Sequence, residues 1–257
     1  MAEQSKFDSE STARHYAAAR PSYPDALFDA LDELLAGRLA GADVVDVAAG
    51  TGIATRALAA RGAHVTAVEL SGAMLSELVP ASPGVRAVQG SGNALPLADS
   101  CADLITYAQA WHWMDAPRAL AEARRVLRPG GVLALWWNQT SRESSWEWEQ
   151  GERITAANMQ WHRYSADYIW EHLELEAELP KHGFQFEWER TIPLETHLSN
   201  LASKSYIAEL GDAMPAFLDR ERAILTQLFP DGRIIERFTT LLAVVLFGTD
   251  LSLAARS

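Results

Sequence analysis

Residues 44–55 read Val-Val-Asp-Val-Ala-Ala-Gly-Thr-Gly-Ile-Ala-Thr, and this stretch decides the fold of the chain. A β-branched run leads into a turn of small residues, and a helix-forming segment follows at once. The turn has almost no side chains, and glycine tolerates positive φ, so a ligand can approach the backbone closely. The pattern predicts a strand, a tight loop and the beginning of a helix.

An acidic residue follows this loop at the end of the next predicted strand. The apolar run 63–68 ends in Glu69, seventeen residues after Gly52. In a doubly wound sheet this residue lies at the tip of the neighbouring strand, where a carboxylate can accept hydrogen bonds from both hydroxyls of a ribose. Loop and carboxylate together predict a site for an adenosine-containing cofactor. The alternative is an ordinary strand-turn-helix unit without a ligand.

Apolar runs alternate with helical periods from residue 43 to 137, which is typical of βαβ units and a parallel sheet. The predicted strands are 43–48, 63–68, 85–89, 103–108, 131–137, 183–191 and 239–247. The predicted helices are 53–61, 72–79 and 116–127, with more helix within 197–230. We therefore expect an α/β fold: a Rossmann-like, seven-stranded, mostly parallel sheet with helices on both faces and a helical insertion after the fifth strand.

The length and composition favour a single domain of 257 residues, because 48% hydrophobic content can bury a substantial core. Its predicted parts are a helical N-terminal arm (1–40), a cofactor-binding core (41–140), a helical cap insertion (141–180), and the remaining core strands and helices (181–257). The insertion is rich in aromatic residues at helical spacing. Its carboxylates, from Glu143 to Glu178, are expected to form a solvated helix face.

Charge and cysteine content exclude several classes of function. A formal charge of -12 and a pI near 5.0 give no electrostatic basis for binding nucleic acid or an anionic membrane surface. The single cysteine, Cys101, cannot form an internal disulfide or a zinc site by itself, and no metal site is expected. The longest apolar stretch, 241–247, is far shorter than a membrane span. We expect a soluble cytoplasmic protein, and the sequence does not indicate its oligomeric state.

The order Asp46-x-Ala-x-Gly-Thr-Gly, with an acidic residue at the end of the next strand, resembles motif I of class I S-adenosylmethionine-dependent methyltransferases. The third glycine of the dinucleotide fingerprint G-x-G-x-x-G is missing, which disfavours NAD. The resemblance implies S-adenosyl-L-methionine as the cofactor. On this resemblance Asp46 orients the amino end of the cofactor, the loop flanks its methionine part, and Glu69 holds its ribose. The family usually has glycine where this chain has Ala48.

Further segments resemble the type 11 methyltransferases, a ubiquinone/menaquinone-biosynthesis-like group with trans-aconitate methyltransferase relatives. Residues 90–97, Gly-Ser-Gly-Asn-Ala-Leu-Pro-Leu, are similar to the group's G-D-A-E-x-L-P-F segment, and Ser91 stands where the family's aspartate binds adenine. Residues 109–113, Gln-Ala-Trp-His-Trp, resemble its A-x-H-W segment, and 128–131 match its R-P-G-G. Residues 16–24 resemble the Y-x-x-x-R-P-x-Y-P arm, which implies that Tyr16 covers the cationic sulfonium.

The resemblance and the loop pattern together imply a full set of candidate site residues. The candidates for binding the cofactor are Tyr16, Asp46, Ala48, Ala49, Gly50, Thr51, Gly52, Glu69, Leu70, Ser91, Gly92, Asn93, Gln109 and Ala110. The candidates for binding the acceptor are Trp111, His112, Trp113 and Trp137, and Trp136 is also expected beside the site. His112 is the candidate general base, because histidine titrates near neutral pH. The other histidines, His197 among them, are expected to have surface or packing roles.

The implied reaction transfers a methyl group to a small molecule. Positioning dominates such a step, and a base is needed only when the acceptor must lose a proton. We expect O-methylation of a small organic acid or natural product. The alternatives are N- or C-methylation of a secondary metabolite, a non-catalytic protein that binds the cofactor, and an NAD-dependent oxidoreductase, which the absence of a Tyr-x-x-x-Lys pair disfavours.

Overall fold

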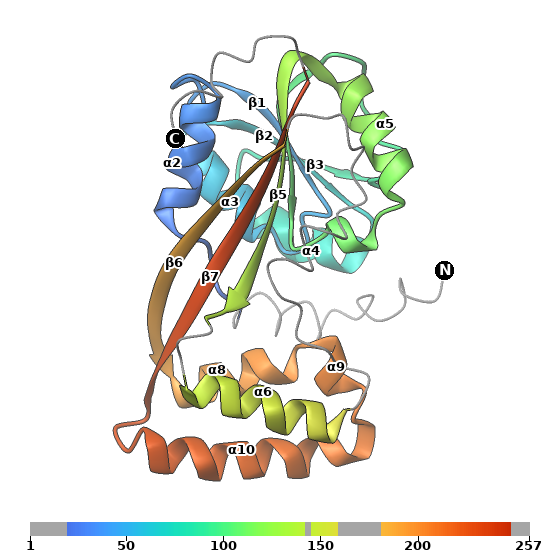
Figure 1. Ribbon diagram of the computed structural model, residues 1–257. Coiled ribbons are helices and arrows are strands. Elements are labelled where there is room, and N and C mark those ends of the chain that lie inside the picture. Colours follow the sequence, from blue (N-terminus) through green and yellow to red (C-terminus); the bar gives the residue numbers. More distant parts are fainter. Residues whose placement is uncertain (1–19, 142–144, 159–180, 248–257) are drawn as a thin grey trace.

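The computed structural model describes residues 20–141, 145–158 and 181–247. Seven strands form one sheet in the order β3-β2-β1-β4-β5-β7-β6 (Figure 1). The strands are β1 (Asp43–Val47), β2 (His64–Glu69), β3 (Arg86–Gln89), β4 (Ala102–Ala108), β5 (Leu127–Thr140), β6 (Lys181–Pro193) and β7 (Arg233–Leu246). Strands β1 to β5 pair in parallel, and β7 runs antiparallel to both β5 and β6. The predicted Rossmann-like α/β fold is confirmed.

The described helices follow the predicted order. They are α2 (Asp25–Leu34), α3 (Ile53–Ala60), α4 (Gly72–Ala81), α5 (Ala116–Val126), α6 (Ser145–Ala157), α8 (Leu194–Ala202), α9 (Ser205–Ala208) and α10 (Met214–Leu228). Short 3-10 turns lie at η2 (Trp111–Trp113) and η3 (Gly211–Ala213). In the first 140 residues the predicted helices are confirmed to within about two residues at each end.

Three strands are longer than their apolar patterns suggested. Strand β5 extends to Thr140 and β7 begins at Arg233, because their antiparallel ladder continues to the pair Thr140 and Phe238, and the ladder of β7 with β6 continues to Pro193. The Arg-Pro-Gly-Gly segment was expected to precede the fifth strand. It lies within β5, where the register with β4 shifts between Leu127 and Val132.

Side chains alternate across the sheet and form two cores. Trp137 packs on the face covered by α5, whereas Trp136 packs on the face covered by α2 and α3 (Figure 1). Trp136 is fully buried, and its ring lies edge-on to Tyr23 and Phe28, with centroids 5.6 and 6.3 Å away. The expectation that Trp136 lies beside the site is therefore wrong, because successive residues of a strand point to opposite faces.

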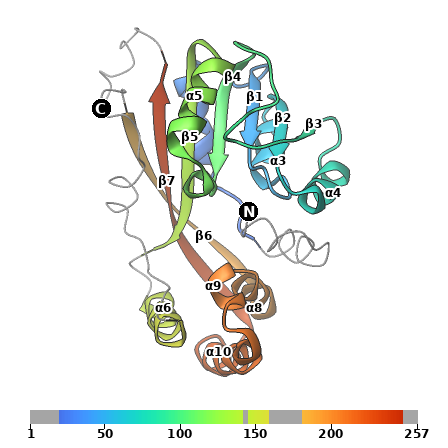
Figure 2. The same cartoon turned by 90° about the vertical axis from the view of Figure 1, so that its right-hand side faces the viewer.

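A helical layer lies beyond the carboxyl ends of the parallel strands (Figures 1 and 2). The ends of β5, β6 and β7 project past the rest of the sheet, and α6, α8, α9 and α10 gather there. We call these four helices the cap. The cap draws on residues 145–157 and 194–228, whereas the sequence had suggested 141–180 alone. Residues 159–180, which include Trp161 and Trp170, lie outside the described residues.

One prediction for α6 is wrong. The carboxylate of Glu147 is not solvated: the residue is 6% exposed, and its Oε1 accepts a hydrogen bond from the backbone N–H of Arg237 at 3.0 Å. Its neighbours Glu149 and Glu152 are exposed, as expected. Within the described part of the chain, no helix is both long and apolar enough to cross a membrane.

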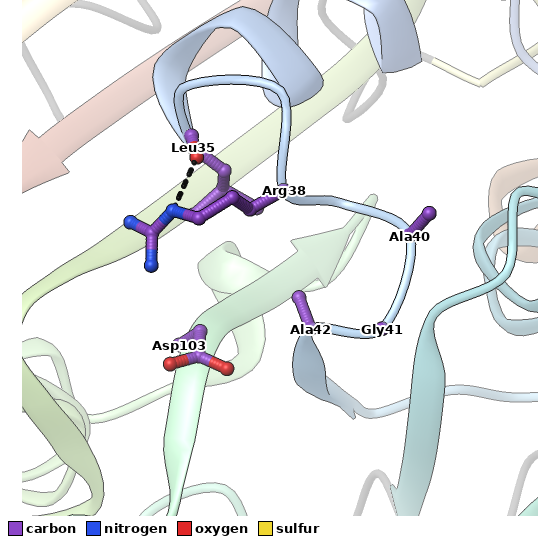
Figure 3. A pocket seen from close by; sticks show the side chains of 6 residues that line it. All are labelled: Leu35, Arg38, Ala40, Gly41, Ala42 and Asp103. Atoms are coloured by element: carbon purple, nitrogen blue, oxygen red, sulfur yellow. Dashed lines mark hydrogen bonds between the residues drawn. The ribbon is translucent and has the colours of Figure 1, made fainter.

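A hollow of about 250 Å³ lies at the opposite end of the sheet from the cap. Figure 3 shows its lining, in which Arg38 and Asp103 are the charged side chains and the guanidinium Nε donates to the carbonyl of Leu35 at 3.0 Å. Asp103 stands at the amino end of β4. Ligands of open α/β sheets bind outside the carboxyl ends of the strands, so this hollow is not the expected site.

Candidate functional site

The loop between β1 and α3 takes the open, left-handed course that its small residues allow. The φ angles are +53° at Ala48, +57° at Gly50 and +83° at Gly52. A Cβ atom placed on Gly50 would meet no other atom within 4 Å, so this turn leaves room for a ligand against its backbone. The hydroxyl of Thr51 is buried and has no hydrogen-bond partner among the described residues. Bare backbone and an unsatisfied buried hydroxyl fit a polar ligand at this loop.

Glu69 stands at the carboxyl end of β2 and reaches the same loop. Its Oε2 accepts the backbone N–H of Gly50 at 2.8 Å, and its Oε1 accepts that of Ser71 at 2.8 Å. The residue is 8% exposed. Each carboxylate oxygen can accept a second hydrogen bond, so the group is held in place and can still accept bonds from two ligand hydroxyls. Glu69 therefore lies at the strand end where the sequence predicts it, and its contact with a ribose stays a prediction.

Asp46 lies beneath the loop rather than on its surface. Its side chain is fully buried, and it accepts hydrogen bonds from the hydroxyls of Thr55 at 2.6 Å and Thr106 at 2.9 Å. Burial raises its pKa to about 6, although the two hydroxyls act in the opposite direction. Through these two hydrogen bonds Asp46 joins the first turn of α3 to β4. Its role in the structure is to hold the start of the helix that follows the loop.

The segment after β3 is held mostly by its own polar groups. The Ser91 hydroxyl accepts the backbone N–H of Asn93 at 3.2 Å, and the Asn93 side-chain oxygen accepts that of Asp115 at 3.0 Å. A Cβ atom on Gly92 would lie 2.6 Å from the sulfur of Met114 and 2.9 Å from Cγ1 of Val47, so a larger residue would force these side chains to move. Leu70, at the other side of this region, is 44% exposed and offers an apolar surface.

The segment after β4 turns sharply toward the cap side. Gln109 has a φ of +59°, and its N–H donates to the carbonyl of Trp136 at 2.8 Å. Ala110 and Trp111 are buried, and the Trp111 ring lies edge-on to Tyr107 at 5.0 Å. Because Trp111 is buried and packs against Tyr107, its ring stabilises the turn and has little surface for contact with an acceptor.

His112 and Trp113 are the exposed members of this turn. Their ring centroids are 4.5 Å apart, and Trp113 is 43% exposed. The protein around the imidazole lowers the pKa of His112 by desolvation, although the residue is exposed and solvent screens part of this effect; the ring is neutral at pH 7. Trp137, on β5, is 8% exposed. Tyr16 lies outside the described residues.

Sequence reasoning missed one residue that organises this edge. The Asn138 amide donates to the carbonyl of Ser22 at 2.8 Å, and its oxygen accepts the hydroxyl of Thr240 at 2.6 Å. That hydroxyl in turn accepts the indole N–H of Trp188 at 2.8 Å. Asn138 therefore links the end of β5 to β7, β6 and the N-terminal segment. The available signal was a polar residue directly after an apolar strand that ends at the predicted site edge.

The described residues contain no group of three or more histidine, cysteine, aspartate or glutamate side chains arranged to hold a metal ion. The candidate groups at this edge of the sheet are instead backbone, a carboxylate, hydroxyls and aromatic rings. These groups suit an organic ligand that carries a sugar diol.

Comparisons with known proteins agree with this geometry. A family model described as a methyltransferase domain matches residues 45–135. An uncharacterized methyltransferase of Mycobacterium tuberculosis is 36% identical over 212 residues, which cover 82% of each chain. A malonyl-[acyl-carrier protein] O-methyltransferase of Pectobacterium atrosepticum is 42% identical over 96 residues, 37% of this chain and 38% of that protein.

Among solved structures, one provisionally assigned as a type II methyltransferase from Anaeromyxobacter dehalogenans superposes with a TM-score of 0.67. The two are 24% identical, and the match covers 88% of this chain and 97% of the other. This likeness concerns the fold. Together with the extended sequence identity and the loop geometry, it shows that the chain belongs to the class I S-adenosylmethionine-dependent methyltransferases of the type 11 group.

Proposed function

We propose that this enzyme binds S-adenosyl-L-methionine between the β1–α3 loop and Glu69 and transfers its methyl group to the carboxylate oxygen of a small organic acid. The observation that carries the cofactor assignment is the position of Glu69. Its carboxylate is fixed by the N–H groups of Gly50 and Ser71 and still has capacity for two hydroxyls. The candidates for cofactor contact from Leu70 to Ala110 follow the carboxyl ends of β2, β3 and β4, which supports a site on this edge of the sheet.

When bound, the cofactor supplies an electrophilic methyl group on a positively charged sulfonium. Once the methyl group has moved to the acceptor, the cofactor is left as a neutral thioether. The chain itself must hold the acceptor in line and exclude water, and alignment of this kind contributes on the order of 7 to 11 kcal/mol to lowering a barrier. Trp113 offers an exposed aromatic wall at the end of β4, and the cap lies on the same side. An aromatic wall of this kind suits a small apolar or planar acceptor.

The weakened basicity of His112 favours an acceptor that needs no base. Desolvation lowers the pKa of the ring, so it is a weaker proton acceptor than an ordinary histidine and would remove a proton from an alcohol or amine less well. A carboxylate is already ionised at pH 7 and attacks without losing a proton. We therefore assign His112 to orienting the acceptor through its ring N–H. The partial similarity to malonyl-[acyl-carrier protein] O-methyltransferases supports the same class of acceptor.

The alternative is methylation of nitrogen or carbon, or binding of the cofactor without catalysis. A panel of small molecules, incubated with the enzyme and the cofactor and followed by mass spectrometry, separates these cases. The proposal expects methyl esters of organic acids that revert to the acids on mild alkaline hydrolysis. Alkali-stable products would overturn the choice of a carboxylate as acceptor, and cofactor binding without any methylated product would point to a binding protein.

A further inference from the structure

Tyr107 lies beneath two segments of the candidate site. It stands near the carboxyl end of β4, is fully buried, and pairs in the sheet with Val47 of β1 and Leu135 of β5. Its hydroxyl donates a hydrogen bond to the carbonyl of Gly92 at 3.3 Å, and its ring lies edge-on to Trp111 at a centroid distance of 5.0 Å. One side chain therefore contacts both the segment after β3 and the turn after β4.

The hydroxyl of Tyr107 acts as a hydrogen-bond donor. Burial, with a smaller contribution from the Glu122 carboxylate, raises its pKa well above its ordinary value, so the group stays protonated. A buried hydroxyl without a partner is costly, and among the described residues Gly92 supplies the acceptor. The bond therefore fixes the direction of the Gly92 carbonyl.

The side chains of the segment after β3 are already engaged by neighbouring N–H groups. The Ser91 hydroxyl accepts the N–H of Asn93, and the Asn93 oxygen accepts that of Asp115. The carbonyl of Gly92 and the N–H of Asn93 belong to one rigid peptide plane, so the bond from Tyr107 orients both. The orientation of this peptide determines which polar groups of the segment face a ligand.

The backbone of Gly92 packs directly on the side chains below it. A Cβ atom at this position would lie 3.4 Å from Cε1 of Tyr107 and 2.6 Å from the sulfur of Met114. The absence of a Cβ lets the peptide approach the tyrosine ring closely. A change at Tyr107 therefore alters the support of this peptide.

The same segment begins beside the proposed ribose site. The N–H of Gly90 donates to the backbone carbonyl of Glu69 at 3.0 Å, and Gln89 pairs with Glu69 in the sheet. In adenosine the base is attached directly to the ribose. With the ribose on the Glu69 carboxylate, we expect the base next to the segment after β3.

We propose that Tyr107 is a positioning residue for the adenine of the cofactor: its hydroxyl orients the Gly92–Asn93 peptide so that this segment recognises the polar edge of the base. The inference rests on the proposed cofactor site. Because the ring also packs on Trp111, Tyr107→Phe keeps the aromatic support of the turn and removes the hydroxyl alone.

Two ligands that differ only in the base test this role by isothermal titration calorimetry. S-adenosylhomocysteine carries an amino group on the six-membered ring of its base, and S-inosylhomocysteine carries an oxygen in its place. The wild type should bind the adenine compound at least about tenfold more tightly, because a site that matches one polar edge leaves groups unpaired against the other.

Tyr107→Phe should bind S-adenosylhomocysteine about three- to tenfold more weakly, the scale of one hydrogen bond, whereas its affinity for S-inosylhomocysteine should change by less than about twofold. Tyr206→Phe makes the same change on α9 of the cap and is the matched control. It should bind both ligands as the wild type does.

An equal loss for both ligands would show that Tyr107 only stabilises the fold, and unchanged affinities would show that its hydroxyl has no role in binding. Either result overturns the inference, as does a wild type that binds the two bases equally. If Tyr107→Phe does not fold, Gly92→Ala displaces the same peptide from its support and should reduce the preference for adenine. An unchanged preference in that variant would overturn the inference. A wild type that binds no S-adenosylhomocysteine would overturn the proposed function as well, so the two failures are distinguishable.

Discussion

The Glu69 carboxylate accepts the backbone N–H of Gly50 at 2.8 Å across a separation of 19 residues. This single bond joins the end of β2 to the loop that follows β1. It holds the carboxylate beside a turn that has no Cβ at Gly50 to obstruct a ligand. The small-residue loop and the acidic strand end therefore belong to one candidate site. Substitutions of Glu69 and of Gly50 can test the two parts separately.

Replacing Glu69 by Gln should weaken binding of S-adenosylhomocysteine by about 1.5 to 3 kcal/mol, the scale of hydrogen bonds to a charged group. The amide removes the charge, and its nitrogen cannot accept from a ribose hydroxyl. Isothermal titration calorimetry measures the change. Glu187→Gln, on the exposed side of β6, is the matched control and should bind with wild-type affinity. Equal affinity in both variants would place the ribose elsewhere.

Gly50→Ala should lower both stability and cofactor affinity, and Gly37→Ala should lower stability only. Both glycines have positive φ, +57° and +73°, and a Cβ on either would meet no atom within 4 Å. The backbone cost is therefore similar, about 1 kcal/mol in the free energy of unfolding. The added methyl at position 50 also occupies the ligand side of the loop. Chemical denaturation and calorimetry separate the two effects, and an equal loss of affinity in both variants would contradict the assignment.

Asp46 should make the unliganded protein less stable as the pH rises. Its pKa is raised from 3.8 to about 6 in the folded protein, so folding favours the protonated carboxyl. The stabilisation is complete below about pH 4 and is lost as the pH approaches about 6, a change on the order of 3 kcal/mol. Other groups also titrate in this range, so the test compares urea unfolding of wild type and Asp46→Asn. As the pH rises, the free energy of unfolding of the wild type should fall relative to that of Asp46→Asn. A difference between the two that does not change with pH would show that Asp46 does not titrate with a raised pKa.

The pH dependence of methyl transfer should contain no histidine step near neutrality. Because the pKa of His112 is lowered, its ring is already neutral at pH 7, and kcat/KM should stay flat from about pH 7 to 8. His112→Gln, which keeps a side-chain N–H donor, should retain activity to within about tenfold. A loss of 10² or more, together with a limb near pH 6.5 in the wild type, would identify His112 as a general base instead.

The sequence predicted the parallel part of the sheet well and the cap poorly. Strands such as β1 and β2 are buried on both faces and separated by glycine-rich turns, so local pattern alone locates them. The left-handed loop and Glu69 follow from those strands. Trp136 was misplaced because two adjacent tryptophans give no sign of which one faces the site. Glu147 was misjudged because its partner, Arg237, lies 90 residues away in the chain. Tertiary contacts of that range leave no local signature.

The account depends most on where the cofactor's ribose binds. A crystal structure of the protein with S-adenosylhomocysteine tests this directly. We predict that both ribose hydroxyls lie within hydrogen-bonding distance of the Glu69 carboxylate, with the thioether chain against the backbone at Gly50. A ligand bound at another edge of the sheet, or a ribose turned away from Glu69, would contradict the account.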